Sequence, residues 1–252
     1  MDKKINNKKL LVIGGTGFIG HNLVKKSIEK GFITYSLSLG KNNNTKRLDG
    51  VNYIFKDLRI DENLRFLQNE EFNYIVNLSG YIDHKPFFMG GDQIILEHFD
   101  LLRNIIKNVN KEALECFVNI GSSDEYGNCI APQNECNREA PISPYSFGKL
   151  ASTHLIEMLY RTEKFKGCSL RLFLTYGPFQ DKKRFIPQII LGCLNNKSFP
   201  VSEGKQKRDL CYIDDVISGI FKVINSKKVY GQTYNLASGK PIEIQEVIRN
   251  IV

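Results

Sequence analysis

The stretch L-L-V-I-G-G-T-G-F-I-G, residues 10–20, decides the fold of this chain. It joins a short apolar run, which predicts a buried strand at Lys9–Ile13, to apolar residues at helical spacing from Phe18 to Lys30. The glycines between them let the backbone turn tightly and approach a pyrophosphate, whose charge is favoured at a helix start. Glycines also serve ordinary turns, but strand, turn and helix follow here in the order that a dinucleotide site requires. The residues expected to contact the cofactor are Gly14, Thr16, Gly17, Phe18, Ile19 and Gly20.

Short apolar runs and helical patterns alternate through the first two thirds of the chain, which predicts a doubly wound parallel sheet of the Rossmann type. Further strands are expected at Ile33–Leu37, Tyr53–Phe55, Tyr74–Leu78, Cys116–Ile120 and Ser169–Phe173, and a long helix at Ile94–Val109. We therefore expect a dinucleotide-binding domain over residues 1–177.

After Gly177 the pattern changes to short helices and isolated strands, which predicts a smaller C-terminal substrate lobe over residues 178–252, interleaved with the first domain. Its expected elements are Phe185–Asn195, Asp214–Ile224, Thr233–Leu236 and a final helix at Gln245–Val252. Because the sequence stops within that helix, the lobe is expected to be incomplete.

Composition limits the class of protein. A chain of 252 residues with 42% hydrophobic residues can bury a core, and no apolar run approaches membrane-spanning length. The net charge of +8 comes without a nucleic-acid-binding module, so we expect an anionic small molecule as partner and no nucleic acid. Six cysteines without a C-x-x-C pair and four scattered histidines favour reduced thiols in a cytoplasmic protein without a structural metal.

The end of the second strand decides which nicotinamide cofactor fits, because a carboxylate there binds the ribose 2′-hydroxyl of NAD. This chain has Ser38 at that point, and Lys41, Lys46 and Arg47 precede the next acid, Asp49. A 2′-phosphate would meet no repulsion and would find cations, which favours NADP over NAD. A basic loop that touches no ligand fits the same residues.

The stretch S-P-Y-S-F-G-K, residues 143–149, predicts a helix start with Ser143 as cap and Pro144 in the first turn. Tyr145 and Lys149 then lie one turn apart on one face. An ammonium beside a phenol lowers the pKa of the tyrosine, which makes it a usable acid and base. A packed tyrosine beside a solvated lysine explains an isolated match equally well, so the neighbouring motifs matter.

A second motif, G-S-S-D-E-Y-G at residues 121–127, follows directly from the strand at Cys116–Ile120. It delivers Ser122 and Ser123 to the carboxyl end of a parallel sheet, where ligands bind in such folds. A serine hydroxyl there can hydrogen-bond a substrate oxygen while the tyrosine moves a proton. The alternative is a plain turn that ends at Gly127.

Four motifs, G-G-T-G-F-I-G, G-S-S-D-E-Y-G, P-Y-S-F-G-K and R-D-L-C-Y-I-D-D-V, occur in this order over nearly the whole chain. Together they resemble the extended short-chain dehydrogenase/reductase family (NAD-dependent epimerase/dehydratase), which modifies nucleotide-linked sugars. The resemblance implies an enzyme that uses NADP or NAD, a nucleotide-diphosphate sugar as substrate, and a homodimer. Leu174 and His98 depart from the family, which often has Asn at both positions.

The resemblance also implies roles for the matching residues. Tyr145 would be the acid/base, Lys149 would lower its pKa and hold the nicotinamide ribose, and Ser122 would polarise the reacting oxygen. Asp57, with Leu58 beside it, matches the aspartate that contacts the adenine of the cofactor. The residues expected to contact the substrate are Ser123, Asp124 and Arg208, the last at its phosphate.

Reactions of this family begin with hydride transfer at a sugar carbon, usually C4. Dehydratases also need a carboxylic acid to eliminate water and often carry adjacent Asp-Glu, but that slot reads Ser123-Asp124 here, so only one acid is in register. We therefore expect a 4-dehydrogenase/4-ketoreductase or a 4-epimerase. A nucleotide-sugar 4,6-dehydratase is the enzymatic alternative. A non-catalytic NAD(P)-binding regulator is the alternative from another class, and the presence of the serine, tyrosine and lysine disfavours it.

Overall fold

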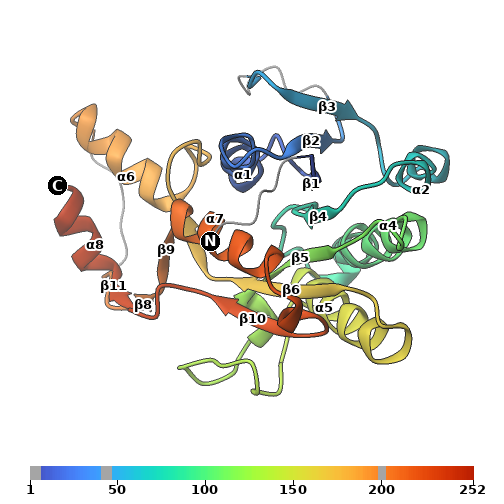
Figure 1. Cartoon of the computed structure of the whole chain (residues 1–252). Helices are drawn as coiled ribbons and strands as arrows, with labels where there is room; N and C mark the ends of the chain where they lie inside the picture. Colours follow the sequence, from blue (N-terminus) through green and yellow to red (C-terminus); the bar gives the residue numbers. More distant parts are fainter. Residues whose placement is uncertain (1–6, 41–46, 198–202) are drawn as a thin grey trace.

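The computed structural model describes residues 7–40, 47–197 and 203–252. Its centre is a seven-stranded sheet in the order β10-β6-β5-β4-β1-β2-β3, in which every neighbouring pair is parallel and helices cover both faces (Figure 1). The strands are β1 (Lys9–Ile13), β2 (Ile33–Ser38), β3 (Val51–Phe55), β4 (Tyr74–Asn77), β5 (Cys116–Ser122), β6 (Gly167–Leu172) and β10 (Thr233–Leu236). The predicted doubly wound, Rossmann-type sheet is confirmed.

The two faces of the sheet carry separate hydrophobic cores. One core packs the even-numbered residues of β1 under α1 (Phe18–Glu29) and α7 (Ile213–Ile224). The other packs Leu11 and Ile13 under α2 (Phe66–Asn69), α4 (Leu101–Asn108) and α5 (Pro144–Glu163). Buried on both faces, the strands read as continuous apolar runs in the sequence, as parallel strands do.

The helix predicted over Ile94–Val109 is interrupted. It consists of α3 (Gly91–Ile95), a π-helical turn η3 (Leu96–Asp100) and α4. The turn holds His98, which is 6% exposed and faces α5, so the interruption lies next to the candidate site. Short 3-10 turns complete this part of the chain: η1 (Asp61–Leu64), η2 (Phe87–Met89), η4 (Ser123–Tyr126) and η5 (Lys227–Val229).

A smaller set of elements lies beside the carboxyl ends of the strands, at the left of Figure 1. It contains α6 (Phe185–Leu194) and α8 (Ile244–Ile251), and two small sheets made by β7 (Leu174–Tyr176) with β9 (Leu210–Tyr212) and by β8 (Lys207–Arg208) with β11 (Ile242–Glu243). The strand expected to be isolated in this lobe, Thr233–Leu236, instead pairs with β6 as the edge of the main sheet. Residues after 177 therefore contribute to both parts, and the division at that residue stays a prediction.

None of the helices in the described ranges combines the length and the apolar character that crossing a membrane requires. All six cysteines are free thiols, but only Cys116, Cys168 and Cys211 are buried.

Candidate functional site: a glycine-rich pocket beside a buried tyrosine

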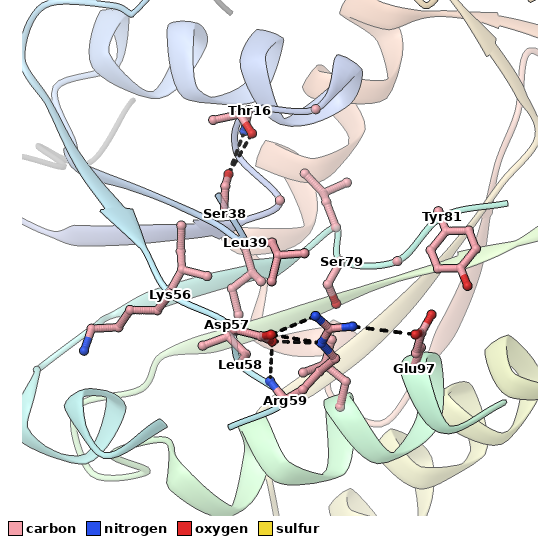
Figure 2. A pocket seen from close by; sticks show the side chains of 17 residues that line it. Thr16, Ser38, Leu39, Lys56, Asp57, Leu58, Arg59, Ser79, Tyr81 and Glu97 are labelled. Atoms are coloured by element: carbon pink, nitrogen blue, oxygen red, sulfur yellow. Dashed lines mark hydrogen bonds and ion pairs between the residues drawn. The ribbon is translucent and has the colours of Figure 1, made fainter. Parts of the chain in front are cut away.

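A pocket of about 330 Å³ opens where β1 and β4 end, the point at which the strand order reverses (Figure 2). Ligands of open α/β sheets bind at this position. Its walls come from the turn after β1, the ends of β2 and β3, and the segment after β4. They are lined by Ile13, Gly14, Thr16, Gly17, Leu37, Ser38, Leu39, Lys56, Asp57, Leu58, Arg59, Leu78, Ser79, Gly80, Tyr81, Glu97 and Leu101.

The glycine-rich turn is tight for a steric reason. Gly14 has φ +83°, and a Cβ there would lie 2.9 Å from the carbonyl oxygen of Leu78. A Cβ at Gly20 would lie 2.2 Å from the carbonyl oxygen of Gly14, so the first turn of α1 packs directly on the loop. Gly17 is the N-cap of α1, and among the described residues no side chain caps this end and no acid lies in its first turn. The helix start therefore suits an anion.

Only part of the predicted cofactor contacts line the pocket. Gly14, Thr16 and Gly17 do. Phe18 and Ile19 instead pack against the core under α1, and Gly20 is covered by the Gly14 backbone. Their predicted contact with a cofactor stays untested.

Ser38 faces the glycine-rich turn. Its hydroxyl lies 2.8 Å from the Thr16 hydroxyl and accepts a hydrogen bond from the Thr16 N–H at 3.3 Å (Figure 2). The end of β2 thus presents a hydroxyl and no carboxylate. Arg47 lies over the rings of Tyr53 and Phe55, and Phe55 is the register partner of Ser38. Lys41 and Lys46 lie outside the described residues.

An ion pair forms the opposite wall of the pocket. Arg59 donates to both carboxylate oxygens of Asp57, at 2.9 and 2.7 Å, and lies 3.7 Å from Glu97 (Figure 2). The hydrogen bond from Arg59 holds the pKa of Asp57 below its usual value. Asp57 and Leu58 line the pocket as predicted, with the Asp57 carboxylate ionised and already held by Arg59.

The helix start predicted at residue 143 is confirmed. The Ser143 hydroxyl accepts from the Ser146 N–H at 3.1 Å, the Ser146 hydroxyl lies 3.0 Å from the Ser143 N–H, and Pro144 occupies the first turn. This capping box fixes where α5 begins. It thereby sets the positions of Tyr145 and Lys149, one turn apart.

The pKa of Tyr145 does not move in the predicted direction. The side chain is 5% exposed, and burial raises its pKa to about 12. A hydrogen bond from Ser122 and the charge of Arg184 offset part of this rise, whereas Asp124 and Glu125 add to it. Lys149 is not among the groups that shift this pKa, and its Nζ donates to the carbonyl oxygen of Ile120, so the lowering expected from Lys149 is not seen.

Lys149 donates a hydrogen bond from Nζ to the carbonyl oxygen of Ile120, 2.9 Å away at the end of β5. Burial lowers its pKa to about 8, and the Glu125 carboxylate opposes that change only in part. The lysine therefore lies between α5 and β5, and its charged form is much easier to deprotonate than that of an exposed lysine.

Ser122 is held by a buried ionic network that the sequence motifs did not predict. Its N–H donates to Glu125 Oε1 at 2.9 Å, while Glu125 Oε2 accepts from Arg171 at 2.8 Å and from Thr153 at 2.9 Å. Glu125 and Arg171 are both fully buried, and Arg171 also pairs with Glu139. Glu125 belongs to the motif G-S-S-D-E-Y-G, but the spacing of that motif does not predict an ion pair with Arg171, which lies 46 residues later in the chain.

Two histidines flank Tyr145, and sequence reasoning assigned neither to the site. The ring of His98 lies 5.1 Å from the tyrosine ring, and its Nε2 lies 3.0 Å from the Tyr81 carbonyl oxygen. Burial, and then the nearby Lys149, lower the pKa of His98 to about 3, so it is neutral and donates to that carbonyl. The ring of His84 lies 5.4 Å from Tyr145 on another side. In the sequence, His98 is only a departure from the Asn that is frequent in the family, and His84 carries no signal beyond its position after β4.

The predicted substrate residues separate into two groups. Ser123 and Asp124 follow Ser122 directly and are partly exposed. Arg208 lies exposed on β8 in the smaller lobe, where its guanidinium donates to the carbonyl oxygen of Lys207 at 2.9 Å. Leu174 is half exposed on β7 and offers no polar group.

Comparison with known proteins gives a consistent result. A model of the NAD dependent epimerase/dehydratase family matches residues 10–237. A dTDP-D-glucose 4,6-dehydratase of Dictyostelium discoideum is 24% identical over 98% of this chain, and the chain spans 64% of that relative's length.

Solved structures agree on the fold. An epimerase of Methanothermobacter thermautotrophicus superposes with a TM-score of 0.88 at 19% identity, covering 98% of this chain and 76% of the other. A dTDP-glucose 4,6-dehydratase of Bacillus anthracis in complex with NAD gives 0.84 at 20% identity, covering 97% and 79%.

Proposed function

Because the chain belongs to the NAD dependent epimerase/dehydratase family, we propose that it is a nucleotide-sugar oxidoreductase that acts at C4 of the sugar. In this proposal it works as a 4-dehydrogenase/4-ketoreductase or a 4-epimerase. The observation that carries the proposal is the buried phenol of Tyr145, one turn from Lys149 and with a pKa that Ser122 partly lowers. None of these three residues lines the glycine-rich pocket, but His98 connects Tyr145 to the pocket residue Tyr81.

The pocket fits a nicotinamide dinucleotide. The uncapped start of α1 suits the pyrophosphate, and the pocket wall at Asp57 and Leu58 suits the adenine end. The chemistry that such a cofactor supplies when bound is uptake of a hydride from the sugar, or its return. Gly14, Thr16 and Gly17 would hold the phosphates, and Lys149 would reach the ribose next to the nicotinamide.

Tyr145 exchanges the proton of the C4 oxygen in this proposal. A phenol with a pKa of about 12 is protonated at neutral pH, which is the form that donates a proton to a ketone under reduction. Oxidation needs the phenolate, which Ser122 and Arg184 favour. Ser122 polarises the same oxygen, and Ser123, Asp124 and Arg208 are assigned to the substrate, with Arg208 at its phosphates.

We propose NADP, rather than NAD, as the preferred cofactor. Support comes from the hydroxyl of Ser38 where a carboxylate would select NAD, and from Arg47 above its neighbour Phe55. The NAD bound in the Bacillus anthracis structure favours NAD instead.

Fluorescence titration should show that the protein binds NADPH more tightly than NADH. The substitution Arg47→Ala should reduce that preference, whereas Lys25→Ala, on the exposed side of α1, should not. Tighter NADH binding would reverse this assignment.

A 4,6-dehydratase is the second candidate, and the name of the Dictyostelium relative favours it. A cofactor-binding regulator without catalysis would need none of the serine, tyrosine and lysine.

A homodimer and a cytoplasmic location complete the proposal. The dimer is supported by Phe147 and Met158, which lie eleven residues apart, about three turns of α5, and are 50% and 40% exposed.

The test is turnover of nucleotide sugars by the Tyr145→Phe variant. We expect kcat to fall by about 100- to 10,000-fold, because the phenol supplies acid–base catalysis of that size. Tyr160→Phe removes a hydroxyl from the same helix further along and should leave kcat unchanged. Equal turnover by both variants would exclude Tyr145 from the chemistry.

A further inference from the structure

Arg59 lines the glycine-rich pocket, and Figure 2 shows its guanidinium between two carboxylates. Its backbone N–H and its Nε donate to Asp57 Oδ1 at 3.0 and 2.9 Å, and its Nη2 donates to Asp57 Oδ2 at 2.7 Å. Its Nη1 lies 3.7 Å from Glu97 Oε1. The Tyr81 hydroxyl hydrogen-bonds the Glu97 carboxylate in turn. The guanidinium is therefore held by its edges.

The faces of this guanidinium remain available to a ligand. The Arg59 side chain is 52% exposed, whereas those of Asp57 and Glu97 are 25% and 18% exposed. A guanidinium is planar, its hydrogen-bond donors lie in its plane, and its faces stack on aromatic rings. Because two carboxylates hold the donor edges, stacking on a face is the main contact that a ligand can make with Arg59.

The surroundings of Arg59 suit an uncharged aromatic ring better than a phosphate. Two carboxylates lie against a single guanidinium, so this wall as a whole does not attract an anion. Lys56 also lines the pocket, but its ammonium lies over the Phe66 ring, 5.5 Å from the ring centre. Leucine side chains add apolar surface to the same pocket: Leu37, Leu39, Leu58, Leu78 and Leu101.

The position of Arg59 in the fold assigns it to one half of a dinucleotide. The glycine-rich turn follows β1, at the middle of the sheet, and its helix start suits the pyrophosphate. Tyr145 lies on α5, which packs beside β5, so the nicotinamide belongs on that side of the turn. Arg59 comes shortly after β3, the edge strand on the other side. That side is left for the adenine.

We propose that Arg59 is a stacking platform for the adenine ring of the nicotinamide dinucleotide, held in place by Asp57 and Glu97. This inference rests on the proposed function, because it takes the pocket to hold that cofactor. Asp57 accepts from three donors of Arg59, and a carboxylate has about four acceptor positions, so one stays open to the adenine amino group. Arg59 thus recognises the plane of the base and Asp57 its edge.

Displacement of bound NADPH, followed by its fluorescence, tests the assignment with the separate halves of the cofactor. Adenosine and ADP probe the adenine side, and nicotinamide mononucleotide probes the other side. Adenosine is uncharged, so it reports stacking with little influence from the charge of the wall. Arg59→Met removes both the plane and the charge, whereas Arg59→Lys keeps the charge alone.

Arg103→Met is the matched control. Arg103 lies on α4, its Nε is 3.0 Å from Asp100 Oδ1, and its side chain is 48% exposed. It therefore resembles Arg59 in exposure and in having an aspartate partner, but it does not line the pocket. Thermal unfolding checks that each variant is folded.

We expect both Arg59 variants to raise the dissociation constants of adenosine and ADP by about tenfold or more, because the stacking of one base contributes on that scale. The constant for nicotinamide mononucleotide should not change, and Arg103→Met should match wild type. Unchanged adenosine binding by Arg59→Lys would mean that the charge matters and the plane does not, which would overturn the inference. Equal losses for adenosine and nicotinamide mononucleotide would indicate a structural role and would also overturn it.

Outcomes with the wild-type protein keep the two proposals distinct. Failure to bind both NADPH and NADH would contradict the proposed function, and the inference would fall with it. Binding of NADPH that adenosine does not displace, or that Arg59→Met does not weaken, would overturn the inference and leave the proposed function standing. Binding that depends on Arg59, without turnover of any nucleotide sugar, would contradict the proposed reaction and support the adenine platform.

Discussion

Tyr145 and Lys149 lie one helical turn apart, and burial moves both side chains toward their neutral forms. The pKa of the phenol rises to about 12 and that of the ammonium falls to about 8. Both changes have the same origin, because a low-dielectric site penalises whichever form is charged. If the proposed function is right, a substrate or cofactor hydroxyl relieves this destabilisation through new hydrogen bonds.

Lys149→Met should therefore raise the stability of the ligand-free protein at neutral pH by on the order of 1 kcal/mol while abolishing turnover. The folded-state pKa of Lys149 lies below its value of 10.5 in the unfolded chain, so the unfolded chain binds more protons between about pH 8 and that value. The cost of the buried charge is thus fully present below pH 8 and is lost as pH rises through this window.

Thermal unfolding at several pH values measures the effect. The advantage of Lys149→Met over wild type should shrink as pH rises above 8, whereas Lys25→Met, at an exposed lysine of α1, should show no such trend. A Lys149→Met protein less stable than wild type at pH 7 would mean that the ammonium is not penalised by burial.

At the scale of elements, a buried ion pair anchors the segment that follows β5 and carries Ser122. η4 provides Glu125, β6 provides Arg171 and α5 provides Thr153, so one carboxylate joins three elements at a point adjacent to Ser122. The Arg171 guanidinium also lies 4.6 Å from the Tyr126 ring. The Tyr126 hydroxyl donates to Asn235 of β10 at 2.7 Å, which extends the anchor to the edge strand.

Glu125→Gln should destabilise the fold by about 3–5 kcal/mol, because it leaves the Arg171 charge buried without its main partner. Chemical denaturation measures the change. Glu163→Gln removes a carboxylate from an exposed pair with Lys111 and should cost less than about 1 kcal/mol. If the two substitutions had equal effects, the buried network would not be what holds the loop.

At the scale of the whole molecule, local signals predicted most of the fold. Six strands of the main sheet, the glycine-rich turn and the capped start of α5 follow from apolar runs, glycines and a Ser-Pro pair within short windows. The edge strand β10 was misplaced because its partner β6 lies more than 60 residues earlier, and pairing at that distance leaves no local pattern.

In the candidate site, too, local motifs predicted some residues, whereas contacts between distant segments were not predictable. Tyr145, Lys149 and Ser122 come from motifs with defined spacing, and Ser122 partly lowers the pKa of the phenol. His84 reaches Asp124 across 40 residues, and Arg171 reaches Glu125 across 46, so both pairs depend on the folded sheet. The direction of the Tyr145 pKa also depends on burial, which spacing alone does not give.

In the proposed function, Tyr145 serves the removal of a hydride from sugar C4. The direct measurement supplies the protein with NADP, and in parallel with NAD, together with dTDP-glucose deuterated at C4. Mass spectrometry follows deuterium in the cofactor in a single turnover, with UDP-glucose treated in the same way. We predict that deuterium moves to the cofactor with wild-type protein and that Tyr145→Phe reduces the rate by about 100-fold or more. No transfer from either sugar, or an undiminished rate with Tyr145→Phe, would contradict the account.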